Sequence, residues 1–130
     1  MSSYEVTEVA APAQTTVAAI RAELKRRGIT EYAVVDHGHD MGAAGVTPHP
    51  AWTLVFGNPA AGEALLAADL SAAVDIPLRL AVIAVDDQHS QIVLRPMETL
   101  LGDQLLAVAE RLTTVLRSIT GAARDAAQAG

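Results

Sequence analysis

The sequence predicts a mixed fold in the order strand, helix, two strands, helix, two strands, helix. Two observations predict it. Apolar runs of strand length alternate with longer stretches in which apolar residues recur every three or four positions, as they do on one face of a helix. Clusters of Gly, Pro, Asn and Asp separate these segments and predict the turns between them.

Each expected element follows from its local pattern. The strands are short apolar runs, expected at residues 4–10, 32–35, 51–56, 78–83 and 91–94. The helices follow the 3.6-residue period and are expected at 13–27, 59–70 and 103–120. The polar connections are a loop at 36–40, an irregular turn at 71–76 and a hairpin connection at 86–90.

Residues typical of helix ends support these boundaries. Gly28 is placed for the left-handed backbone that closes the first helix. Two glycines within residues 41–46 allow at most one helical turn there. Asn58 is a good N-cap and Pro59 a good first residue for the next helix. Within that helix three leucines are expected to face inward, namely Leu65, Leu66 and Leu70.

The composition indicates one domain, residues 1–130, with a core of small aliphatic side chains. Hydrophobic residues make up 51% of the chain and aromatic residues only 3%, so Val, Leu, Ile and Ala must supply the core. The net charge of −6 argues against a nucleic-acid partner, which needs clustered basic residues. Because there is no cysteine, disulfides, thiolate catalysis and Cys-based zinc sites are excluded.

Neither a targeting segment nor a membrane span is expected. Residues 1–10 contain two glutamates and no cationic start, unlike a signal peptide. The longest apolar run, at 78–85, is interrupted by Arg79 and is far shorter than the roughly 20 residues of a membrane span. We therefore expect a cytoplasmic protein without a membrane partner.

Several motifs, correctly ordered and spaced, resemble those of one bacterial family. The runs Val35–His37, Thr53–Pro59 and Ala73–Leu78 are similar to the Asp-His pair, Phe-Gly-Asn-Pro turn and Asp-Leu-Pro-Leu entry of domain-of-unknown-function family 302 (DUF302). The resemblance covers residues 13–101. Arg79 replaces the family's usual lysine, and residues 92–94 lack its polar run.

The resemblance implies an α+β fold like that of the TATA-box-binding protein. In such a fold a curved, mostly antiparallel sheet carries helices packed on one face, and family members often form dimers. It implies no nucleic-acid role, because a fold does not carry a function with it.

The central candidate site is the strand-to-helix corner at Phe56, Gly57, Asn58, Pro59 and Gly62. The two glycines have the spacing of a phosphate-binding P-loop, but Glu63 and Ala64 stand where that motif needs Lys and Ser or Thr. Nucleotide hydrolysis of that type is therefore excluded. Two interpretations remain: the helix N-terminus binds a small polar or anionic ligand, or Asn58 and Pro59 only cap the helix.

The run Asp36-His37-Gly38-His39-Asp40 is the second candidate site. On an extended segment His37 and His39 would share one face, which makes them candidate metal ligands. Alternatively, Asp36 caps the following turn and the histidines are solvated. No serine or threonine is placed as a nucleophile beside His37, so no catalytic residue and no cofactor is predicted.

The last helix, 103–120, carries apolar residues on more than one face, so it can cover the sheet, meet a partner, or both. Residues 121–130 are expected to fray. The leading hypothesis is a small-molecule-binding or sensing homodimer whose site lies between Asp36-His37 and the Gly57 corner. The alternatives are a metal-dependent or hydrolytic enzyme that uses residues 36–40, and a structural or partner-binding dimer without a ligand.

Overall fold

The computed structural model describes residues 3–130, and its strands form one antiparallel five-stranded sheet ordered β1-β5-β4-β3-β2. The strands are β1 (Glu5–Val9), β2 (Thr30–Asp36), β3 (Ala51–Gly57), β4 (Leu78–Asp86) and β5 (His89–Leu94). The α-helices are α1 (Ala13–Arg26), α2 (His37–Ala43), α3 (Pro59–Ala68) and α4 (Leu106–Ala129). Three short 3₁₀-helices are η1 (Leu70–Asp75), η2 (Met97–Thr99) and η3 (Asp103–Leu105). The predicted α+β class is confirmed.

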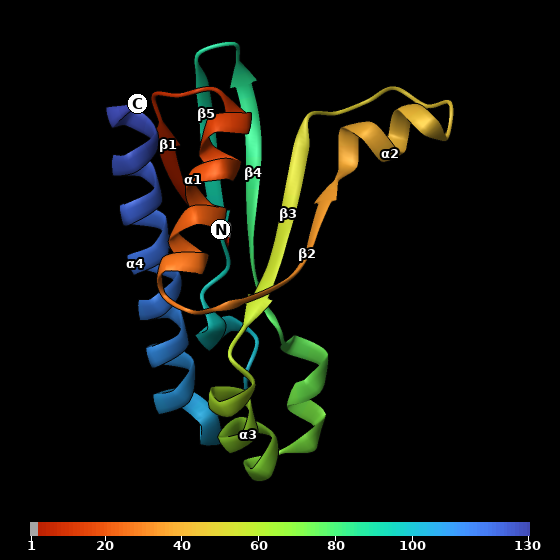
Figure 1. Cartoon of the computed structure of the whole chain (residues 1–130). Coiled ribbons are helices and arrows are strands. Elements are labelled where there is room, and N and C mark those ends of the chain that lie inside the picture. The colour runs from red at the N-terminus through yellow and green to blue at the C-terminus, as the bar shows by residue number, and fades with distance from the viewer. Residues whose placement is uncertain (1–2) are drawn as a thin grey trace.

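One face of the sheet is covered by α1 and α4, which lie side by side (Figure 1). Alternate strand residues such as Leu54, Leu80 and Ile92 point to this face and are fully buried. The side chains between them, such as Thr53 and Ala81, lie on the opposite face, which neither α1 nor α4 covers. The core therefore lies between one sheet face and two helices.

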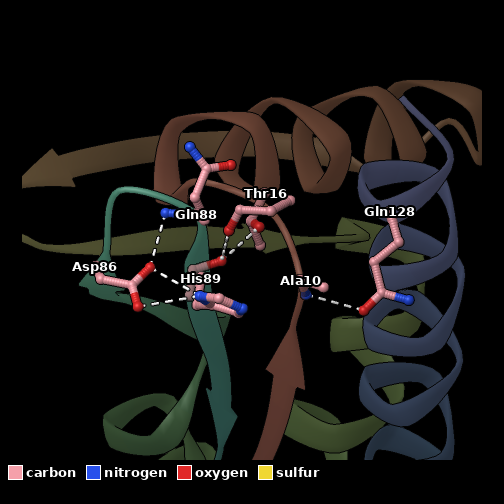
Figure 2. Close-up of polar contacts among 8 residues, drawn as sticks. Ala10, Thr16, Asp86, Gln88, His89 and Gln128 are labelled. Atoms are coloured by element: carbon pink, nitrogen blue, oxygen red, sulfur yellow. Dashed lines mark hydrogen bonds and ion pairs between the residues drawn. The ribbon is translucent and has the colours of Figure 1, made fainter.

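A buried polar cluster ties α1 to the β4–β5 hairpin (Figure 2). The hydroxyl oxygens of Thr16 and Ser90 are 2.7 Å apart, and Ser90 also donates to the carbonyl of Ala11 at 2.9 Å. All the hydroxyls of this cluster are thus paired, as burial requires. Nearby, the Gln128 side chain accepts a hydrogen bond from the backbone of Ala10 at 3.0 Å and fixes the end of α4 against the start of α1.

Three local expectations are wrong. The last helix does not fray after Gly121 but runs to Ala129, because Ala123 and Ala127 are buried against the core. Leu70 does not face inward in the second long helix; it starts η1 and is 77% exposed. The expected polar loop at 36–40 is largely helical, because α2 starts at His37.

Candidate functional site

A pocket of about 790 Å³ lies at the end of the sheet where β3 leads into α3. Its walls come from α3, η1, α4 and the ends of β2, β3 and β4, which meet in the lower half of Figure 1. It is lined by Ile29, Tyr32, Phe56, Gly57, Asn58, Pro59, Ala61, Gly62, Glu63, Leu65, Leu66, Ala67, Leu70, Ile76, Pro77, Leu78, Val108, Leu112 and Val115. The predicted site residues from Phe56 to Gly62 are therefore brought together around one cavity.

The pocket lining is mainly apolar. Its polar side chains are those of Tyr32, Asn58 and Glu63, and it contains no Lys, Arg or His. A carboxylate at the rim and the absence of a cation in the lining disfavour an anionic ligand. The volume is that of an ordinary small-molecule site. The pocket is therefore suited to an uncharged, mainly apolar molecule.

The N-terminus of α3 has few free donors. The Asn58 side chain accepts from the N–H of Ala60 at 3.0 Å, and the Asn58 carbonyl accepts from Gly62 at 2.9 Å. Pro59 has no N–H. Only the N–H of Ala61 is left in this turn without a partner among residues 3–130. One donor is a weak anchor for a phosphate or carboxylate, so the geometry favours the capping interpretation of Asn58 and Pro59.

The Asp36-His37 corner lies far from this pocket. In the antiparallel β2–β3 pair, Asp36 is opposite Trp52 and Gly57 is opposite Thr30. The two corners are thus separated by five residue steps along β3, about 17 Å at the usual rise per residue. The prediction of one binding surface between the two corners is therefore wrong. Consecutive antiparallel strands place successive turns at opposite ends of a sheet.

Residues 36–40 adopt a capped helical start. The Asp36 carboxylate accepts from the N–H of His39 at 2.9 Å, and Nε2 of His37 lies 2.7 Å from the Thr53 hydroxyl. His37 and His39 are two positions apart on a helix, about 200° around its axis, so they do not share a face. Within residues 3–130 no three His, Cys, Asp or Glu side chains are grouped to hold a metal.

Sequence reasoning missed the far wall of the pocket. Val108, Leu112 and Val115 come from α4, about fifty residues beyond the β3–α3 corner. A signal was present, because the last helix has more apolar positions than a sheet-covering face needs. That excess was interpreted as core or dimer surface, whereas part of it lines the cavity.

The comparisons with known proteins agree with this fold. A family model described as "Domain of unknown function DUF302" matches residues 5–124. The crystal structure of an uncharacterized conserved DUF302 protein from Bacillus stearothermophilus superposes with a TM-score of 0.77 at 16% identity, covering 98% of this chain and 99% of that one. A search of curated proteins finds no match. No helix in the described residues is long and apolar enough to cross a membrane.

Proposed function

The chain belongs to the DUF302 family, and we propose that it binds an uncharged, mainly apolar small molecule in the pocket beside α3. One observation carries the proposal: a cavity of about 790 Å³ remains between α3, η1 and α4, and its lining is mainly apolar. Apolar side chains that line a cavity open to water stay in contact with it, and an apolar ligand would remove that surface from water.

Two leucines at the pocket with surface exposed to water support this function. Leu66 is partly buried and Leu70 is 77% exposed, although both are large apolar residues of the lining. A bound apolar molecule would remove their surface from water, at about 25 cal/mol per Å². Glu63, which is exposed, would repel an acidic ligand.

The test is a titration with the neutral fluorescent probe N-phenyl-1-naphthylamine. We expect saturable binding with one probe per chain, and no competition by inorganic phosphate. Val108→Trp should place an indole ring in the cavity and weaken binding, because Val108 lines it. Ala107→Trp, at the exposed neighbouring position outside the lining, should keep it. Equal binding by both variants, or no binding by the wild-type protein, would refute the proposal.

A second observation favours self-association. Across the uncovered face of the sheet the register aligns one row of small, mainly apolar residues, namely Val6, Val93, Ala81, Thr53 and Val35. Val6 is 51% exposed. We propose that two copies form a homodimer through this face, because a two-fold axis pairs one surface with itself.

Substitution at the centre of that row tests the homodimer. Ala81→Glu places a charge on the proposed interface and should convert the dimer to a monomer in native mass spectrometry and sedimentation velocity. Ala107→Glu, on an exposed position of α4, is the matched control and should leave the dimer intact. A wild-type monomer, or an Ala81→Glu dimer, would contradict the proposed interface.

A further inference from the structure

Two arginines at one end of the sheet differ from most of the others in their surroundings. The arginines that lie within ion-pair distance of a carboxylate are Arg21, Arg26, Arg27, Arg117 and Arg124. Arg79, Arg95 and Arg111 form no ion pair with any of residues 3–130, and the first two lie at the same end of the sheet. In a chain of net charge −6, two arginines without a carboxylate partner need an explanation.

These two arginines lie at the same end of the sheet. The β4–β5 register ends at the pair Ala81–Val93, and Arg79 on β4 and Arg95, just after β5, both lie two residues beyond that pair. Like charges near one another repel. An anion bound between the two side chains would offset that repulsion.

Arg95 is held in place by its neighbours. Its guanidinium carbon lies 4.7 Å from the centre of the Tyr4 ring, and one of its nitrogens donates to the Ser3 hydroxyl at 3.1 Å. Contact with an aromatic ring and a hydrogen bond both limit the conformations of the side chain. One of the two cations is thus already oriented before a ligand arrives.

Arg79 and Arg95 both line a second pocket, of about 300 Å³. Between η1 and η2 its other walls are mostly apolar, with Val74, Met97 and Leu100 among them, and Asp75 supplies one carboxylate. The pocket has space for a small head group and a short apolar body. It shares Pro77 and Leu78 with the larger pocket but none of that pocket's α3 or β3 residues.

We propose that Arg79 and Arg95 form a binding site for a small phosphate monoester with a short apolar substituent. A phosphate monoester carries a charge of about −1.5 to −2 near neutral pH, which two guanidinium groups match. Guanidinium groups bind phosphate oxygens through paired, charge-assisted hydrogen bonds. Asp75 opposes the ligand and sets an upper limit on affinity. This site is independent of the apolar pocket and extends the binding functions of the chain.

Isothermal titration calorimetry with n-butyl phosphate at low ionic strength tests the site. We expect the wild-type protein to bind n-butyl phosphate in a saturable way. It should not bind n-butanol or n-butylammonium. Arg79→Gln and Arg95→Gln should each weaken binding at least about tenfold, because a charge-assisted contact is lost. Asp75→Asn should strengthen binding. Arg111→Gln makes the same charge change on α4, outside the pocket, and should leave binding unchanged.

A stability measurement separates this site from a purely structural arginine pair. Because two guanidinium groups at one pocket repel each other, Arg79→Gln should raise the melting temperature of the free protein while it weakens butyl phosphate binding. Circular dichroism verifies that each variant is folded. Absence of butyl phosphate binding by the wild-type protein, or equal binding by Arg79→Gln and Arg111→Gln, would overturn the proposal.

Discussion

At the residue scale, Thr113 joins two parts of the fold through one buried hydroxyl. It is fully buried on α4, where it accepts from the backbone N–H of Met97 at 2.8 Å and donates to the Glu98 carboxylate. A substitution that keeps the volume but removes the hydroxyl leaves the Met97 N–H buried without its partner. The destabilisation then comes from desolvation rather than from a cavity.

Thr113→Val should therefore lower the free energy of unfolding by about 1–3 kcal/mol, the usual cost of an unsatisfied buried group. Urea denaturation measures it. Thr114→Val is the matched control, because Thr114 is exposed and its hydroxyl bonds only to the preceding turn at Glu110. Its effect should stay within about 0.5 kcal/mol. Equal effects of the two substitutions would show that the Met97 hydrogen bond contributes little.

Local residue chemistry was predictable where it depends on near neighbours in the chain. Asn58 and Pro59 were recognised as helix-capping residues, and the structure places both at the start of α3 with the Asn58 side chain on Ala60. The pocket beside these residues also depends on α4, about fifty residues further on, and no local pattern reports that contact.

At the element scale, the end of α1 carries an ion-pair cluster that makes stability depend on pH. Glu23 accepts hydrogen bonds from Arg26 and Arg27, and these bonds, that from Arg26 foremost, lower the pKa of its carboxyl to about 2. Arg27 also donates to Ser118 on α4 at 2.9 Å. The cluster thus links the two helices that cover the sheet.

The direction of this pH effect follows from the pKa of Glu23 in the folded and in the unfolded chain. In the unfolded chain the Glu23 pKa is about 4.3, so ionised Glu23 stabilises the fold above that pH and the contribution is lost as the pH falls toward 2. The stability difference between the wild-type protein and Glu23→Gln should therefore shrink between pH 5 and pH 2, roughly the window set by these pKa values. Chemical denaturation of both proteins across this range measures it. Because exposed ion pairs are weak, a small difference is expected, and a constant gap would contradict the assignment.

Helix α2 shows why one element was mispredicted. Gly38 and Gly42 disfavour a helix by about 1 kcal/mol each, and for that reason the sequence favoured a loop. The structure compensates through the Asp36 cap on His39 and through the contact of His37 with Thr53 on β3. The sequence allowed the Asp36 cap as the alternative to a metal site. The contact of His37 with Thr53 depends on the strand pairing.

At the scale of the whole molecule, the alternating segment types predicted the α+β class. They did not predict where the corners at Asp36 and Gly57 lie relative to each other. The β2–β3 antiparallel pairing places Asp36 and Gly57 at opposite ends of the sheet. The antiparallel sheet that the family resemblance implies already requires this, but the family motifs suggested a single site. Long-range packing, not local pattern, determines which residues share a cavity.

The most direct measurement of apolar ligand binding is methyl NMR of the protein titrated with N-phenyl-1-naphthylamine. The methyl resonances of Leu66, Leu112 and Val115, which line the pocket, should shift in a saturable way. Those of Val93 and Val35, on the uncovered sheet face, should not. Shifts confined to the sheet face, or none at saturating probe, would contradict an apolar ligand site beside α3.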